Sequence, residues 1–121
     1  MVTDYKIHTD VKFAGLELVD AGRLGRECTE KWWNQSLVRV NDCVIRLGVF
    51  AGEFHFHKHD LEDEYFQVME GELHIDLEGS SVALGPGQGY MVPRGVVHRT
   101  RAPTRTVVLM VEAATVKPTG D

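Results

Sequence analysis

Turn-forming residues divide the second half of this sequence so closely that every element between them must be short. Glycine and proline recur along it, and both residues interrupt helices and long strands. The segments between the turns are rich in Val, Ile, Leu and Phe, without the sustained apolar period of an amphipathic helix. The pattern predicts an all-β fold with little or no helix, arranged as an antiparallel barrel or sandwich. The predicted turns lie at residues 41–42, 70–71, 78–81, 85–89 and 93–95.

The length of 121 residues fits one domain with one hydrophobic core. We expect residues 1–30 to form N-terminal strands or an arm of this domain, and residues 31–115 to form the barrel. Residues 116–121 are rich in Pro and Gly, and we expect them to form a loose C-terminal tail. Within the arm, we expect strands at 11–13 and 16–19 and a turn at 21–23.

Charge and composition narrow the possible partners and the location. The formal net charge of -5 argues against binding to nucleic acid or to an anionic membrane. No apolar run approaches the ~20 residues of a membrane helix. Charges such as Asp4 and Lys6 exclude the apolar core of a signal peptide, so we expect a cytoplasmic protein. Cys28 and Cys43 do not resemble a disulfide framework, and we expect Cys43 to be a buried free thiol.

Two adjacent tryptophans, Trp32 and Trp33, point to opposite faces if they lie on a strand. One of them can then enter the core while the other stays outside. A large aromatic side chain left outside favours a covered surface such as a subunit interface, although packing on the core or at a sheet edge would also account for the pair. From this pair we expect a homodimer.

A stretch in the middle of the chain concentrates side chains that bind metal ions. It contains His55, His57, His59 and Glu64, and the histidines lie in a predicted strand at residues 53–59. Side chains alternate along a strand, so His57 and His59 point to the same face, and His55 shares their parity. Two imidazoles and a carboxylate on neighbouring strands predict a metal site that needs one more ligand.

Strand pairing predicts that Glu64 points into the fold. If residues 70–71 close a hairpin, the residues that face this strand from the returning strand are apolar. The facing pairs are then Val68 with Leu73, Phe66 with Ile75, and Glu64 with Leu77. A buried carboxylate without a partner is very costly, so a metal ion or a basic residue must lie beside Glu64.

His98 supplies the fourth ligand in this pattern. Two spaced motifs carry the set, namely His57-x-His59-x4-Glu64-x6-Gly71 and Gly87-x5-Pro93-x-Gly95-x2-His98. Together they resemble the two signature motifs of the cupin superfamily, over residues 44–112 in particular, and the chain is similar to small single-domain cupins. Two positions depart from the family pattern. Gly52 is separated from the first ligand by one residue fewer than usual, and Ala102 stands where Asn is common, but neither position is a ligand.

The resemblance implies a jelly-roll barrel, also called a double-stranded β-helix, with one divalent transition metal ion inside. The ligands that it implies are His57, His59, Glu64 and His98. Three imidazoles and a carboxylate suit Fe(II), Mn(II), Ni(II), Co(II), Cu(II) or Zn(II). In an octahedral site they leave positions open for water or substrate, as a catalytic metal requires.

A second register of the first motif uses His55, His57 and Glu62, which have the same internal spacing. It does not reach a glycine at the right offset, and it leaves Glu64 inward without a partner, so we favour the first register. His55 is then a deeper pocket residue, a hydrogen-bonding residue behind the ligands, or a packed side chain.

Side-chain alternation also predicts the pocket beside the metal. A mostly apolar lining with a few polar groups fits a small organic ligand. Arg94 and Arg99 lie near His98 in the sequence, and they would attract an anionic substrate unless they are simply solvated surface charges. The predicted lining residues are His55, Phe66, Val68, Tyr90, Val92 and Met110, with Phe54 or Phe56 near the rim.

Two functional hypotheses follow. The first is a metal-dependent enzyme, of the dioxygenase or isomerase type that the family resemblance implies, acting on a small polar or anionic molecule. Glu64 is its candidate catalytic base. The second is a non-catalytic cupin that binds or senses a small ligand in the same pocket. For both, the expected partners are a small molecule and a second copy of the chain, and neither nucleic acid nor a membrane.

Overall fold

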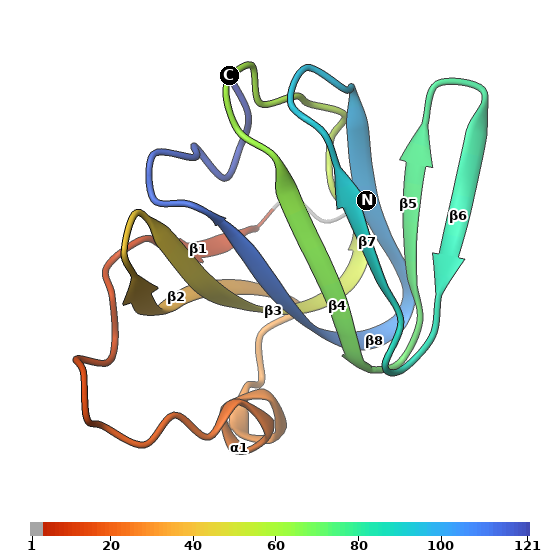
Figure 1. The fold of residues 1–121 in the computed structure, drawn as a ribbon. Coiled ribbons are helices and arrows are strands. Elements are labelled where there is room, and N and C mark those ends of the chain that lie inside the picture. Colours follow the sequence, from red (N-terminus) through yellow and green to blue (C-terminus); the bar gives the residue numbers. More distant parts are fainter. Residues whose placement is uncertain (1–3) are drawn as a thin grey trace.

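The long strand β8 (His98–Ala113) connects the two halves of the fold, which the computed structural model describes for residues 4–121. β8 pairs with β3 (Cys43–Glu53) along most of its length, while its C-terminal half also pairs with β4 (Glu64–Glu70) and its N-terminal part with β5 (Leu73–Leu77). As a result, β5 and its neighbour β6 stand apart from the strands around β3 and β4 (Figure 1).

The remaining strands complete a jelly roll. The strand order is β1-β2-β3-β8-β4-β7, and β5 joins β8 to β6. Every pairing is antiparallel except that of β1 with β2. The predicted all-β jelly-roll fold is therefore confirmed. The elements not yet bounded are β1 (Lys6–His8), α1 (Ala21–Glu27), β2 (Trp32–Val40), β6 (Ser80–Leu84) and β7 (Gly89–Val92).

The predicted hairpin between β4 and β5 is wrong, although its conclusion about Glu64 holds. β4 pairs with β7 and β8, while β5 pairs with β6 and β8. The chain leaves β4 through Gly71, whose φ is +86°, and crosses over against β8. There the Thr106 hydroxyl donates to the carbonyl of Glu72 (2.9 Å) and accepts from its N–H (3.1 Å). Alternation along β4 by itself buries every second side chain, Glu64 included.

Two groups of apolar side chains stabilise the fold. The inner cluster fills the interior of the barrel. The outer cluster lies on the opposite face of β2, β3 and β8. Full burial of one large apolar side chain stabilises the fold by roughly 1.5–3 kcal/mol. The inner cluster includes Trp32, Phe50, Phe54, Phe66, Val68, Leu73 and Ile75, and the outer cluster consists of Leu37, Leu47, Val49 and Val107.

The strands predicted at 11–13 and 16–19 are absent from the part of the chain that the structure describes. Phe13 donates a backbone hydrogen bond to Leu37 (2.8 Å), but the pairing does not extend into a ladder. Only β1 adds a strand to the sheet, beside β2. Local composition favoured strands in this arm, but a strand needs a neighbour along its whole length.

The helix α1 replaces the turn predicted at residues 21–23. Asp20 caps it, because its carboxylate accepts a hydrogen bond from the N–H of Arg23 (3.1 Å). Leu24 packs on the outer cluster, so tertiary contacts stabilise a helix too short to show a clear apolar period. Neither α1 nor any other helix among residues 4–121 is long and apolar enough to cross a membrane.

The two tryptophans do point to opposite faces of β2. Trp32 lies in the inner cluster, 2% exposed, while Trp33 is half-buried and packs against the outer cluster. The arm therefore covers Trp33, and the argument for an interface at this residue loses its basis.

Cys43 is exposed and Cys28 is half-buried, so the predicted burial of Cys43 is wrong. Cys43 begins β3 directly after the turn at 41–42, where the sheet ends.

The segment of residues 116–121 is attached to the barrel, so the predicted loose tail is wrong. Val116 is buried, and the N–H of Asp121 donates to the carbonyl of Lys58 (2.9 Å). The composition of the segment is typical of a mobile end, but hydrogen bonds to a distant loop hold it in place.

Candidate metal centre

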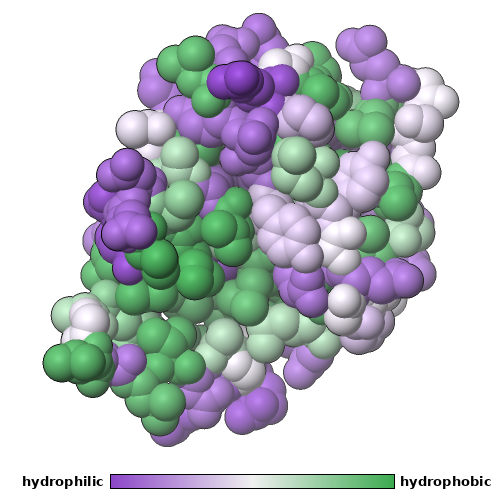
Figure 2. Space-filling model, in the orientation of Figure 1, coloured by the Kyte–Doolittle hydropathy of each residue, from purple (hydrophilic) through white to green (hydrophobic). Residues whose placement is uncertain are grey.

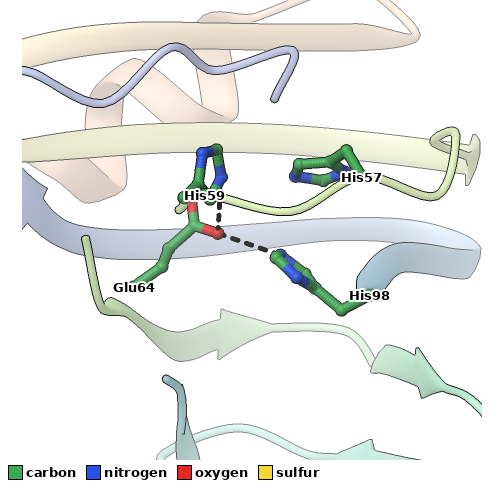
Figure 3. Close-up of side chains that lie close together, drawn as sticks. All are labelled: His57, His59, Glu64 and His98. Atoms are coloured by element: carbon green, nitrogen blue, oxygen red, sulfur yellow. Dashed lines mark hydrogen bonds and ion pairs between the residues drawn. The ribbon is translucent and has the colours of Figure 1, made fainter. Parts of the chain in front are cut away.

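Four side chains from three parts of the chain converge at one end of the barrel (Figure 3). Glu64 begins β4 and His98 begins β8, while His57 and His59 come from the loop between β3 and β4. β3 ends at Glu53, so the strand predicted at residues 53–59 is wrong, and most of that stretch is a loop. His57 nevertheless keeps extended pairing, because its N–H and carbonyl exchange two hydrogen bonds of 2.9 Å with those of His98.

One carboxylate oxygen lies at the centre of this group. Glu64 Oε1 is 3.1 Å from His98 Nε2 and 3.5 Å from His59 Nε2. The four side chains each offer one ligand atom, and these atoms all lie within 4.8 Å of one another. His59, Glu64 and His98 are buried, and His57 is partly exposed. The predicted ligand residues are therefore close neighbours in the fold.

Backbone carbonyls orient two of the imidazoles. His57 Nδ1 is 3.0 Å from the carbonyl of His55, and His98 Nδ1 is 2.9 Å from the carbonyl of Val96. A carbonyl only accepts, so each Nδ1 must carry the proton. In the neutral ring of His57, Nε2 then keeps a free lone pair, which is the arrangement that metal-binding histidines commonly show, whereas Nε2 of His98 is within hydrogen-bond distance of Glu64 Oε1 (3.1 Å).

His59 provides the clearest test of whether a metal ion fits. Its side chain is 2% exposed, and neither ring nitrogen has a hydrogen-bond partner among the described residues. The contact from His59 Nε2 to Glu64 is close enough for an ion pair but lacks the geometry of a hydrogen bond. A buried polar group without a partner is destabilising by ~1–3 kcal/mol. A cation bound between one of these nitrogens and Glu64 would satisfy that nitrogen, so the residues present fit a metal ion.

The protonation states of the metal-free site also suit a cation. Burial lowers the pKa of His57 to about 4, despite a backbone hydrogen bond that acts in the other direction, so this imidazole is neutral near pH 7. Burial would raise the pKa of Glu64, but interactions with His59, His98 and Glu112 outweigh burial and lower the pKa. The site therefore presents a carboxylate together with a neutral imidazole.

A buried polar group behind Glu64 is missing from the sequence-based prediction. Glu112 lies directly opposite Glu64 on β8, and burial together with the neighbouring carboxylate raises the pKa of Glu112. The neutral Glu112 can donate a hydrogen bond to Glu64. Arg46 lies 3.3 Å from Glu112 and donates to Asn34 Oδ1 (2.8 Å), and both Arg46 and Glu112 are almost completely buried. The sequence could have indicated that Glu112 points inward, since it lies two residues from Met110, a predicted pocket residue, on the same strand.

The pocket beside the four side chains is mostly aromatic and apolar. Of the predicted lining residues, Phe66 and Met110 line it, while Val68 and Val92 lie within the core and Tyr90 packs against the core. The lining residues are Trp32, Asn34, Phe50, Phe54, His57, Glu64, Phe66, Thr100, Met110 and Pro118.

His55 lies outside the pocket, so the prediction that it lines the pocket is wrong. It is exposed, and its Nε2 lies 2.6 Å from the carbonyl of Thr119. Glu62 accepts a hydrogen bond from the Thr115 hydroxyl (2.8 Å), and although its carboxylate lies near His59, it is not among the four side chains that converge with Glu64. The register with His57, His59 and Glu64 is thus the one whose side chains converge.

The two predicted anion-binding arginines do not line the pocket either. Arg99 donates to Asp76 (2.8 Å) and to Glu53 (3.1 Å), and its guanidinium lies over the ring of Phe56. Arg94 is exposed, and its backbone N–H donates to Asp63. Carboxylates already neutralise Arg99, because Asp76 and Glu53 lie on strands that flank β8, so its charge is not directed at the candidate metal centre.

Comparison with known proteins matches this chain to one family. The family model described as "Cupin domain" matches residues 44–112. The uncharacterized protein YdbB of Bacillus subtilis (strain 168) is 46% identical over 90 residues, which are 74% of this chain and 80% of that protein. The polyketide synthase CurC of Streptomyces cyaneus is 40% identical over 58 residues, which are 48% of this chain and 36% of that protein.

A solved structure agrees with the sequence comparison. A cupin-2 domain containing protein from Shewanella frigidimarina NCIMB 400 superposes with a TM-score of 0.75 at 28% sequence identity. The match covers 79% of this chain and 94% of that chain. Sequence and fold thus point to the same group of proteins.

Proposed function

This chain belongs to the cupin domain family, and from that premise we propose that it binds one divalent transition metal ion and uses it on a small molecule. The proposed ligands are His57, His59, Glu64 and His98, whose donor set suits Fe, Mn, Ni, Co, Cu or Zn. The observation that carries the proposal is the buried imidazole of His59, which has no hydrogen-bond partner among the described residues. When bound, such an ion supplies Lewis-acid chemistry and, for a redox-active metal, oxygen chemistry.

The pocket favours a molecule that is largely apolar and carries a few polar atoms. Phe50, Phe54 and Phe66 offer aromatic walls, and Asn34 and Thr100 offer hydrogen bonds that orient a ligand. The lining contains no Lys or Arg, so we favour a neutral substrate over the anionic one expected from Arg94 and Arg99. The Streptomyces relative is named as a polyketide synthase, which supports an organic ligand of this kind for the part of the chain that matches.

Glu64 and Glu112 form a pair suited to hold one proton. The pKa of Glu112 is raised and that of Glu64 is lowered, because burial tolerates one charge in the pair far better than two, so a neutral Glu112 can donate to an ionised Glu64. In the enzyme that we propose, of oxygenase or isomerase type, Glu64 is the candidate base and Glu112 holds it in place.

A ligand-binding or sensor role for the same pocket is the second candidate. One observation favours it: apart from the proposed metal ligands, the polar lining consists of Asn34 and Thr100, and neither titrates. Oxygen uptake and conversion of a panel of small oxygen-bearing molecules by the metal-loaded protein would separate the two roles. Tight retention of a ligand without turnover would favour binding.

Metal content tests the proposal directly. We expect protein purified without an affinity tag to contain one equivalent of a divalent transition metal by elemental analysis. The His59→Ala variant removes a ligand and should lose most of that metal, whereas His8→Ala, which changes an exposed histidine of β1, should retain it. A wild-type protein that takes up no transition metal, or a His59→Ala variant that keeps its metal, would contradict the proposal.

A further inference from the structure

The segment of residues 117–121 lies along the histidines from the outside. The carbonyl of Thr119 lies 2.6 Å from His55 Nε2, and the N–H of Asp121 donates to the carbonyl of Lys58 (2.9 Å). The carboxylate of Asp121 accepts from the N–H of Asp60 (2.6 Å). Figure 1 shows this C-terminal end beside the loop that leads into β4.

The histidine segment, residues 54–60, depends on contacts with residues 117–121 because it is not part of a regular strand. β3 has ended at Glu53, and beyond it the segment is tied to the barrel by the bridge between His57 and His98 and by single backbone hydrogen bonds from Phe54 to Thr100 (3.0 Å) and from Gly95 to His59 (2.8 Å). Loops with few backbone hydrogen bonds open more easily than strands within a ladder. The contacts from residues 117–121 add a second line of attachment on the opposite side of the segment.

Gly120 lets the two segments approach each other closely. Its φ is +97°, and its N–H donates to the carbonyl of Lys117 (2.8 Å), which closes a turn. A Cβ on residue 120 would lie 2.5 Å from the Cβ of His57. Only glycine tolerates both the backbone conformation and this contact. The backbone at residue 120 therefore limits where the His57 side chain can lie.

Asp121 lies where the third imidazole lacks an acceptor. Backbone carbonyls satisfy Nδ1 of His57 and of His98, but both ring nitrogens of the buried His59 are without a partner among the described residues. The carboxylates of Asp121 and Glu62 lie within 4.8 Å of a His59 ring nitrogen. A carboxylate that accepts from a metal-binding imidazole orients the ring and increases its basicity.

We propose that residues 117–121 are a positioning element of the metal centre. Gly120 seats the segment against His57, and Asp121 supplies the carboxylate that orients His59 from behind. Pro118 also lines the pocket, so the same segment covers one side of the bound small molecule. This inference rests on the proposed metal-binding function, and it assigns a role to residues outside the family match at 44–112.

The test compares two glycine variants by titration with Co(II). Gly120→Ala adds a methyl group against His57, whereas Gly79→Ala adds one at a similar φ (+75°) with nothing within 4 Å. Both variants place an alanine at a similar positive φ. The difference in Co(II) affinity between them therefore isolates the contact with His57. We expect Gly120→Ala to weaken Co(II) binding about 10-fold or more, and Gly79→Ala to stay within about 2-fold of wild type. Thermal unfolding of the metal-free proteins checks that both variants fold.

A second pair of variants tests the carboxylate. Asp121→Ala should weaken Co(II) binding about 10-fold and shift the visible absorption bands of bound Co(II), because His59 loses its orientation. Asp10→Ala removes the same charge from an exposed residue of the arm and should change neither quantity. Equal Co(II) affinity for Gly120→Ala and Gly79→Ala, with unchanged bands for Asp121→Ala, would overturn this inference while leaving the proposed function intact. A wild-type protein that binds no Co(II) would overturn both.

Discussion

At the scale of single residues, the buried polar groups around Glu64 distinguish this barrel interior from an ordinary core. Ionisable side chains are rarely buried unless they are paired. Here Glu64, Glu112 and Arg46 are buried together, beside His59 and His98. Glu64 lies beside His59 and His98, and Arg46 lies beside Glu112, but Arg46 Nη2, Glu112 Oε2 and both ring nitrogens of His59 have no hydrogen-bond partner among the described residues. Of these atoms, the His59 nitrogens are the ones that lie at the candidate metal centre.

His57 gives the metal-free protein a specific pH dependence. Its folded-state pKa of about 4 lies below the ordinary value of 6.5, mainly because burial disfavours the imidazolium. The unfolded chain therefore takes up this proton first as the pH falls. The stability that neutral His57 contributes is present above pH 6.5 and is lost between pH 6.5 and about pH 4.

The corresponding test is urea denaturation of the metal-free wild type and of His57→Asn. Between about pH 7.5 and pH 4.5, the free energy of unfolding of the wild type should fall by on the order of 2 kcal/mol more than that of His57→Asn. Parallel pH profiles of the two proteins would show that His57 titrates normally in the folded state.

At the scale of elements, β8 decides how the strands pair. It pairs with β3 along most of its length, with β4 along its C-terminal half and with β5 at its N-terminal end, so the chain must cross from β4 to β5 rather than turn back. The crossing point is Gly71, where an added Cβ would lie 2.7 Å from the carbonyl oxygen of Arg105 and 2.9 Å from Thr106 Cα. Both contacts are with backbone atoms, which cannot move aside as a flexible side chain would.

Gly71→Ala should therefore destabilise the fold more than a matched change elsewhere. Its cost includes backbone strain at φ +86° and a clash with β8, and we expect the free energy of unfolding to fall by roughly 2–3 kcal/mol. Gly79→Ala shares the backbone strain without the clash, so it should cost about 1 kcal/mol. Urea denaturation measures the free energy of unfolding of both variants. Equal losses would mean that the crossover at residue 71 can shift to accommodate the added methyl group.

At the scale of the whole molecule, the outer face of the neighbouring strands β3, β8, β4 and β7 carries a row of apolar side chains across these four strands. Register places Val111 beside Ile45 on one side and beside Tyr65 on the other, and Tyr65 beside Met91. Val111 and Met91 are 40% and 49% exposed. Figure 2 shows hydrophobic atoms gathered over β3 and β8 on this face. The homodimer stays a prediction, and this row replaces Trp33 as its expected contact.

A charge placed in the row tests the dimer. We expect wild-type protein at micromolar concentration to show the mass of a dimer by light scattering, and Val111→Glu to shift it to a monomer, because a buried unpaired carboxylate opposes association. Leu61→Glu changes a more exposed apolar residue in the loop before β4 and should leave the dimer intact. A wild-type protein with the mass of a monomer would contradict the predicted homodimer.

Two local regularities in the sequence, together with the family resemblance of the spaced motifs, predicted the fold class and the four candidate ligands. Alternation with a period of two decides which face of a strand a side chain occupies, so it placed Glu64 inside although its strand partner was misassigned. The spacing of His57, His59, Glu64 and His98 is likewise a property of the chain that needs no knowledge of its neighbours.

Only the tertiary structure decided which segments meet. The pairing of β8 with both β4 and β5, the pair of Glu64 with Glu112, and the contacts of residues 117–121 with the histidine segment all join residues far apart in the chain. Such contacts depend on how the whole set of backbone hydrogen bonds is satisfied at once, and alternation along one strand carries no information about its partner. Arg99 shows the same limit, because its position near His98 in the sequence indicated the metal centre, whereas Asp76 and Glu53 bind its charge in the folded protein.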